Sequence, residues 1–372
     1  MYVYVCMYVC VCMYALGPVY RFIDNLRAVR WVGETYVYSE KRFADFFFQG
    51  ILVFSSFLLS FGYALYYQMT VGDLPLSLIF AYNFAWVGFG GRVMGGAYTF
   101  AHKEGHLPHL YRPWIRNTVG NFFENWLGCF FGNVPYNFTT SHIAIHHKLN
   151  AGRGDTFYQW DLDRSSWSDF MLFLHRILLH TTGYSSLAYF VAMERTVFFN
   201  KLLRGCIVYW LVVPSLLLLA TQSWSFLFFI YLEPLLGMTY FLAFMNYGFH
   251  GFIEFDETGA HIPCVNSIAI IEGQDDYFGE DDHMAHHYAT RVYWRDLPQY
   301  QAEHMDEYKK HHASVFRNLS IVELSMFMLI KEWKLLASHY VDYTGKMSID
   351  EIAKMLEARA KRLDPPLKAK SS

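Results

Sequence analysis

The chain contains 372 residues, of which 54% are hydrophobic, 19% aromatic and 17% charged. Soluble domains usually carry about 25% charged residues, so this composition favours an integral membrane protein. The formal net charge of -3 gives no electrostatic support for nucleic-acid binding, and the sequence contains no basic groove or finger motif. The six cysteines are not spaced as a disulfide framework, which indicates a reducing compartment or burial in lipid.

The first 14 residues repeat Tyr, Val, Cys and Met and lack the basic segment of a signal peptide. They resemble the translation of a simple nucleotide repeat, and a wrongly placed start codon is the preferred explanation. No function is assigned to them. The sequence predicts three regions, which are a lead-in at 1–43, a membrane domain at 44–300 and a cytosolic helical tail at 301–372.

Four apolar stretches are long enough to cross a bilayer, which takes about 20 residues. They lie near 46–67, 76–101, 206–221 and 224–249. Short connections at 68–75 and 221–223 join them into two helical hairpins. These connections contain no Lys or Arg, whereas the segment from 102 to 204 and both termini are rich in them. The positive-inside rule therefore places both termini and the central segment in the cytosol.

Further helices are expected outside the spans. The apolar segments 120–135 and 170–192 are predicted to be in-plane helices or half-buried caps over the site, with one or two further shallow spans as the alternative. Segments 301–312 and 348–363 have the pattern of amphipathic helices, and Ser348 with Glu351 matches a capping box. The chain ends in a KxKxx sequence that resembles the dilysine retrieval signal of endoplasmic-reticulum membrane proteins, so we expect that membrane.

Nine of the 17 histidines form three short motifs, HxxxH, HxxxHH and HxxHH, together with one separate position after the fourth apolar stretch. They are His102, His106, His142, His146, His147, His250, His283, His286 and His287. Residues three or four apart on a helix share a face, so each motif can direct two or more imidazoles at one point. Imidazole suits zinc, copper, iron and nickel, and nine ligands exceed the four that a tetrahedral zinc takes. The pattern predicts two metal ions on the cytosolic side.

The order of these motifs resembles the membrane-bound fatty acid desaturase family, which includes related alkane and acyl hydroxylases. The resemblance covers roughly 46–300, and the sequence from Asn246 to Gly251 is similar to the NYxxH element of that family. It implies that the nine histidines are catalytic and bind two Fe2+ ions. It further implies O2 as co-substrate, abstraction of hydrogen from an unactivated acyl C–H bond, and electrons from an external donor.

The resemblance leaves two reactions open. Three residues separate His142 from the His146–His147 pair, where most desaturases have two, and this spacing resembles the hydroxylases. The four-span count resembles the desaturases, so we expect a fatty acyl desaturase acting on acyl-CoA or acyl-lipid, with hydroxylation as the alternative. The sequence has no HPGG haem motif, which implies a partner such as cytochrome b5 or a ferredoxin-type donor with its reductase.

Polar side chains near the motifs are candidates for holding the imidazoles in place. When one ring nitrogen binds a metal, the other one, called here the outer nitrogen, carries an N–H that is bonded to a carboxylate, a backbone carbonyl or water. Acidic groups also offset the charge of the metals. The candidates are Asp155, Asn246, Glu254, Asp256, Glu280, Asp281 and Asp282.

Two other classes of protein explain less of the pattern. A histidine-rich zinc transporter would place ligands within the spans, and a zinc hydrolase needs only three protein ligands. The predicted fold is an all-α integral membrane protein with about four transmembrane helices in two hairpins. A cytosolic helical cap is expected to hold the two-metal site.

Overall fold

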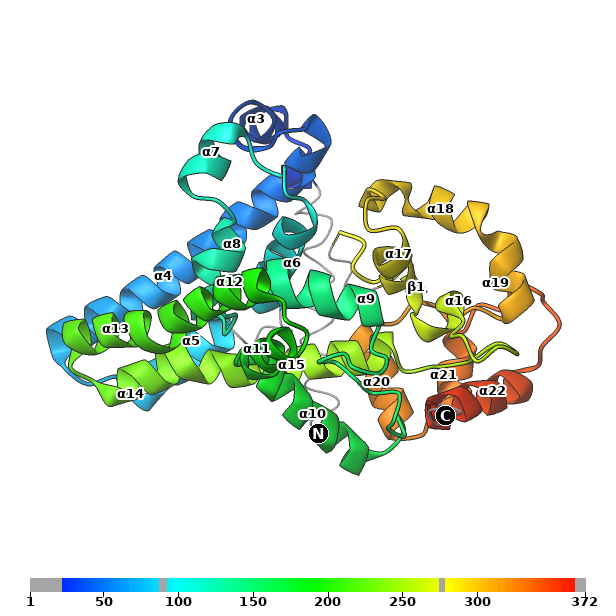
Figure 1. Cartoon of the computed structure of the whole chain (residues 1–372). Coiled ribbons are helices and arrows are strands. Elements are labelled where there is room, and N and C mark those ends of the chain that lie inside the picture. The colour runs from blue at the N-terminus through cyan, green and yellow to red at the C-terminus, as the bar shows by residue number, and fades with distance from the viewer. Residues whose placement is uncertain (1–21, 87–91, 274–277, 365–372) are drawn as a thin grey trace. The chain divides into compact units, whose positions relative to one another are not determined.

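The computed structural model describes residues 22–86, 92–273 and 278–364 (Figure 1). The chain divides into two compact units. Unit 1 consists of Met1–Ala144 and Thr181–Thr239, and unit 2 of Ile145–His180 and Tyr240–Ser372. The boundaries fall within three helices, which are η5 (Phe138–His146), α10 (Trp167–Thr181) and α15 (Glu233–Phe249). The first 14 residues and the KxKxx ending lie outside the described residues.

Long apolar helices dominate unit 1. Among the described residues, three helical runs are long and apolar enough to cross a membrane, namely Lys41–Val71, Thr196–Thr221 and Trp224–Phe249. They correspond to three of the four predicted spans. The other predicted span gives α5 (Leu76–Trp86) and α6 (Arg92–His106), and residues 87–91 between them are not described. The count of four spans therefore stays a prediction.

The three runs are built from consecutive helical elements. These are η2 (Lys41–Phe46) with α4 (Phe47–Val71); α12 (Thr196–Ile207), η6 (Val208–Val212) and α13 (Val213–Thr221); and α14 (Trp224–Phe226), η7 (Leu227–Leu232) and α15. Within the second hairpin, Gln222 ends α13 in the left-handed conformation and Ser223 accepts a hydrogen bond from the Phe226 N–H at 3.1 Å. This cap turns the chain sharply, as the sequence predicts, and α13 packs against α4 and η7 (Figure 1).

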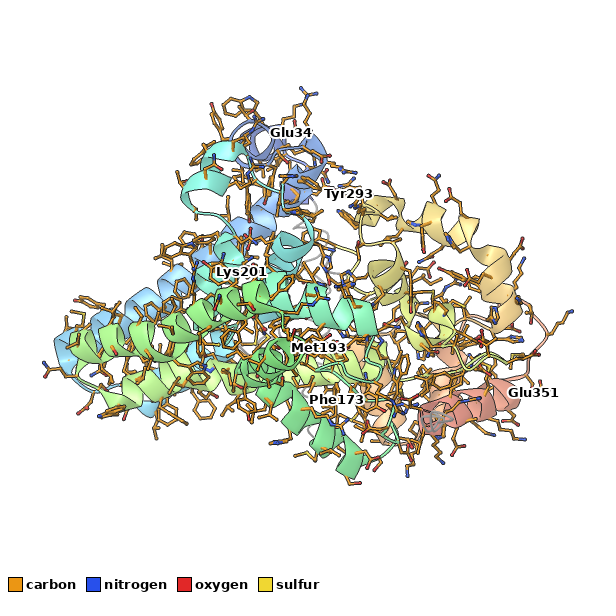
Figure 2. All side chains as sticks on the ribbon, in the orientation of Figure 1. Glu34, Phe173, Met193, Lys201, Tyr293 and Glu351 are labelled. Carbon is orange, nitrogen blue, oxygen red and sulfur yellow. The ribbon has the colours of Figure 1, made fainter. Side chains whose placement is uncertain are left out.

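Large apolar side chains on α4, α5 and α13 lie at the surface. Leu59, Phe80 and Leu219 are 73%, 77% and 76% exposed, and Figure 2 shows the side chains of the described residues. Soluble proteins rarely expose apolar side chains over a continuous area. The exposed faces of α4, α5 and α13 therefore fit contact with lipid.

Shorter helices complete unit 1. They are α3 (Arg27–Val32), η1 (Gly33–Val37), α7 (Pro113–Thr118), α8 (Phe122–Asn125), η4 (Leu127–Phe130) and α11 (Tyr184–Ala192). The predicted cap segments 120–135 and 170–192 are thus helical, as α8 with η4 and as α10 with α11. Gly205 of α12 lies so close to the Pro135 carbonyl that a Cβ atom would clash with it. This contact fixes the segment that leads into η5.

Unit 2 is also mostly helical. Its further helices are α9 (His147–Leu149), α16 (Pro263–Asn266), α17 (His283–Tyr288), η8 (Trp294–Asp296), α18 (Leu297–Glu303), α19 (Met305–His311), α20 (Ile321–Leu329), α21 (Trp333–His339) and α22 (Ile349–Lys361). The predicted helix at 301–312 is interrupted at His304, between α18 and α19. The predicted helix at 348–363 is confirmed as α22, including the capping box of Ser348 and Glu351.

The all-α prediction needs one correction in unit 2. Strands β1 (Ala269–Ile271) and β2 (Val315–Arg317) pair in parallel, with Ala269 opposite Val315. Strands of three residues are too short to show an alternating pattern, so the sequence did not reveal them. The strands share a buried core with α16, α17 and α19 that includes Cys264, Met284 and Tyr308, and this core holds α17 in place.

Candidate metal centre

Four buried histidines converge in unit 2. The ligand atoms of His146, His250, His283 and His287 all lie within 4.8 Å of one another. The Nε2 atom of His283 is 3.0 Å from Nε2 of His250 and 3.0 Å from Nε2 of His287. Four ring nitrogens directed at one point match the donor set of a transition metal. We call this group the four-histidine cluster.

Three chain segments carry the four-histidine cluster. His146 ends η5, His250 follows α15 directly, and His283 and His287 lie one helical turn apart on α17. The start of α17 is fixed by Asp282, whose carboxylate accepts hydrogen bonds from the Ala285 N–H at 2.9 Å and the Gln301 side chain at 2.7 Å. The cap and the helical spacing together place both α17 imidazoles on one face.

The outer nitrogens of two cluster histidines are held by protein groups. The Nδ1 atom of His146 lies 2.8 Å from the carboxylate of Asp155, and both side chains are fully buried. The Nδ1 atom of His250 lies 3.0 Å from the Asn266 carbonyl. A histidine that binds a metal typically donates its other N–H in this way, so both Nδ1 contacts fit metal binding through Nε2.

Burial sets the protonation of this region. It lowers the pKa of His250 to about 3, and it lowers the pKa of His287 well below the usual value, with the neighbouring imidazoles adding to both shifts. Burial alone would raise the pKa of Asp155, but the adjacent His146 and two backbone N–H groups lower it overall. His250 and His287 are therefore neutral, so that their lone pairs can bind a metal, and the ionised carboxylate of Asp155 lies in the same region.

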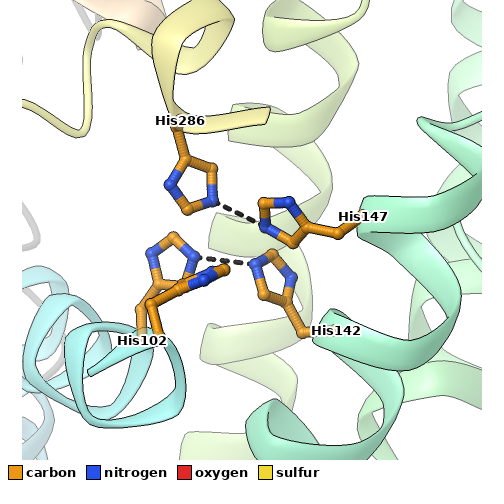
Figure 3. Close-up of side chains that lie close together, drawn as sticks. His102, His142, His147 and His286 are labelled. Atoms are coloured by element: carbon orange, nitrogen blue, oxygen red, sulfur yellow. Dashed lines mark hydrogen bonds between the residues drawn. The ribbon is translucent and has the colours of Figure 1, made fainter. Parts of the chain in front are cut away.

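The other five motif histidines form two contacts, one in each unit (Figure 3). In unit 1, His102 and His106 of α6 lie with His142 of η5, and their ligand atoms are within 4.8 Å of one another. Nε2 of His102 is 2.7 Å from Nε2 of His142. In unit 2, Nε2 of His147 is 2.9 Å from Nε2 of His286.

Three predicted partners of the imidazoles contact other groups instead. Glu254 pairs with Arg359 of α22 at 2.6 Å, Asp256 accepts from the Thr258 and Ala260 N–H groups of a turn, and the Asn246 amide donates to the Leu242 carbonyl. A role of these three residues in holding an imidazole stays a prediction. Arg359 lies 105 residues after Glu254, so the sequence could not show that a cation occupies this carboxylate.

The remaining predicted acids lie beside α17. Glu280, Asp281 and Asp282 are 6%, 4% and 3% exposed. Asp282 acts on the site through the cap of α17, whereas a role of Glu280 and Asp281 in holding an imidazole stays a prediction.

Glu104, which sequence reasoning missed, lies between His102 and His106 on α6. It is 1% exposed and accepts hydrogen bonds from the Tyr111 hydroxyl at 2.6 Å and from the N–H groups of Phe123 and Glu124 at 3.1 and 2.8 Å. It therefore ties the helix that carries the first motif to α8. The position of an acidic residue inside a histidine motif could have identified Glu104 from the sequence.

The buried carboxyl group of Glu104 is expected to make the free energy of unfolding depend on pH. Burial raises the pKa of Glu104 from 4.5 to about 8, so between these values the folded protein holds a proton that the unfolded chain releases. The free energy of unfolding therefore falls as the pH rises through this range, because release of this proton increasingly favours the unfolded chain. We expect Glu104→Gln to flatten this decline in thermal unfolding of the metal-free protein in detergent. Glu307→Gln, at an exposed position of α19, is the control, and an unchanged slope in Glu104→Gln would refute the assignment.

The histidine clusters, together with three apolar helices that could span a membrane, are features of a membrane metalloprotein. The sequence model of the fatty acid desaturase family matches residues 74–318, which is more than half of the chain. The protein therefore belongs to the fatty acid desaturase family. All nine motif histidines lie within the matched region. Comparison with curated proteins gave no match, and comparison with solved structures gave none either.

Proposed function

We propose that the protein is a membrane-bound di-iron oxidoreductase that introduces a double bond into a fatty acyl chain, carried as acyl-CoA or acyl-lipid. The observation that carries this proposal is the four-histidine cluster, with its outer nitrogens held by Asp155 and Asn266, in a chain of the desaturase family.

The residues fit iron. One ion would be held by the four-histidine cluster, whose neutral nitrogen donors suit iron as well as zinc or copper. The proposed ligands of the second ion include His102, His106 and His142 of unit 1, whose ligand atoms lie within 4.8 Å of one another. His142 and His146 lie four residues apart in η5, so one helix supplies ligands to both ions.

The protein contributes positioning and charge. When bound, the two irons supply the activation of O2 that allows hydrogen to be removed from an unactivated C–H bond. Asp155 orients His146 and places a negative charge behind it, which offsets the charge of a metal bound only by neutral ligands. Burial of the cluster keeps water away from the reacting atoms. Electrons would come from a partner such as cytochrome b5 or a ferredoxin-type donor with its reductase.

Hydroxylation is the second candidate reaction. It is favoured by the three residues between His142 and the His146–His147 pair, a spacing that resembles the hydroxylases. The two reactions share the first hydrogen abstraction and differ in whether a second hydrogen leaves or oxygen is added. The proposed location is the endoplasmic-reticulum membrane with both termini in the cytosol.

Expression in yeast followed by lipid mass spectrometry tests the reaction. We expect fatty acyl chains that have lost two hydrogen atoms, whereas the gain of one oxygen atom would establish hydroxylation. A His286→Ala variant should produce neither. If membranes containing the wild-type protein show neither product, metal uptake by proteoliposomes would test the transporter alternative.

A further inference from the structure

Asn150 lies four residues after His146 and was not a candidate on sequence grounds. It follows α9 in the left-handed conformation, with φ of 50°, and its backbone N–H donates to the His146 carbonyl at 2.7 Å. The side chain is 4% exposed. Its Nδ2 atom donates to the Tyr288 hydroxyl at 2.7 Å, and its Oδ1 atom accepts from the Ser267 hydroxyl at 3.1 Å.

The two partners of Asn150 adjoin the other ligand segments. Tyr288 is the last residue of α17 and follows His287. The Ser267 hydroxyl lies 3.4 Å from Nδ1 of His250, next to the Asn266 carbonyl that contacts the same nitrogen. The Asn150 side chain thus bonds directly to α17 through Tyr288 and reaches His250 through Ser267, while its backbone N–H bonds to His146. All of these residues belong to unit 2.

Such a connection has a physical purpose. Four imidazoles on three separate segments must keep their ring nitrogens directed at one point before a metal binds, and groups outside the cluster can fix the segments in that arrangement. The position requires a residue that tolerates a left-handed backbone and offers both a donor and an acceptor. Asparagine meets both requirements, since it adopts this conformation more readily than most residues and its amide supplies both groups.

We propose that Asn150 is a positioning residue that fixes the geometry of the four-histidine cluster before the metal binds. The inference rests on the proposed function, because it assumes that the cluster holds iron. It differs from the roles of Asp155 and Asn266, each of which contacts a single imidazole. Asn150 links the three ligand segments, directly at His146 and α17 and through Ser267 at His250, and its bonds do not involve the Nε2 atoms of the cluster.

The test compares Fe2+ affinity in purified variants by competition with a colorimetric chelator. Asn150→Gly keeps a left-handed backbone accessible and removes both side-chain hydrogen bonds. We expect its Kd for Fe2+ to rise about 10- to 100-fold. Tyr288→Phe and Ser267→Ala each remove one hydroxyl and should have smaller effects. Because Tyr288 acts through Asn150, the effect of Asn150→Gly with Tyr288→Phe should be less than additive.

Asn318→Gly is the matched control, because Asn318 is exposed and has a left-handed φ of 56°. Hydrogen exchange of the metal-free proteins gives a second readout, in which α17 and α16 should exchange faster in Asn150→Gly than in Asn318→Gly. If Asn150→Gly does not fold, the Fe2+ affinity and hydrogen exchange of Tyr288→Phe are compared with those of Asn318→Gly instead. Wild-type affinity and exchange in these variants would overturn the positioning role. A wild-type protein that binds no iron would instead refute the proposed function, and the exchange measurement would still decide the role of Asn150.

Discussion

Replacing His283 by alanine is expected to empty the four-histidine cluster and to abolish product formation. His283 is central to the cluster, since its Nε2 atom lies 3.0 Å from Nε2 of both His250 and His287. Removing a hydrogen-bond partner of a metal ligand typically lowers the metal affinity about 10- to 100-fold. Removing the ligand itself should lower it at least about 100-fold. Iron analysis of purified His283→Ala should therefore find one iron per chain in place of two.

The control for this prediction is His175→Ala. His175 lies on α10 in the same unit, is exposed and belongs to none of the histidine motifs. It should retain both the iron content and the lipid products of the wild type. Two irons per chain in His283→Ala would show that the cluster is not a metal site.

Asp155→Asn is expected to have the second largest effect. Both carboxylate oxygens accept backbone N–H groups, from Ala151 and Phe157, while one also contacts His146. An amide of the same size must direct an N–H group at one of these partners and removes the negative charge. We expect a loss of about 10- to 100-fold in Fe2+ affinity, measured by chelator competition.

Asp161→Asn serves as its control. Asp161 lies on the same segment, but its carboxylate pairs with Arg176 at 2.7 Å and is 35% exposed. An exposed ion pair of this kind contributes little, about 0–1 kcal/mol. If both variants bind Fe2+ equally tightly, the carboxylate of Asp155 does not support a metal ligand.

The histidine motifs were predictable because helical spacing is a local property of the sequence. His283 and His287 share a face of α17 for that reason alone, and Asp155 lies near enough to His146 in the chain to be a candidate. Glu254 also lies near a motif in the chain, but the partner that it contacts, Arg359, lies far away in sequence. Proximity in the chain identified Asp155 together with its contact to His146, but it could not show the long-range partner of Glu254.

Contacts made by backbone groups, and strands of only three residues, could not be predicted from the sequence. The Asn266 carbonyl that contacts His250 exists at every residue, so no residue type identifies it. The strands β1 and β2 are too short to carry a pattern, although they hold α17 in place. For the spans, 46–67, 206–221 and 224–249 were predicted by hydrophobic length, which is the main requirement for crossing a bilayer.

Metal analysis of the purified wild-type protein tests the central proposal most directly. Iron and zinc are measured together by mass spectrometry after purification in detergent, and His175→Ala and His283→Ala are analysed in parallel. The proposal predicts two irons and no zinc per wild-type chain, with the lower iron content confined to His283→Ala. Stoichiometric zinc, or iron content that does not depend on His283, would contradict it.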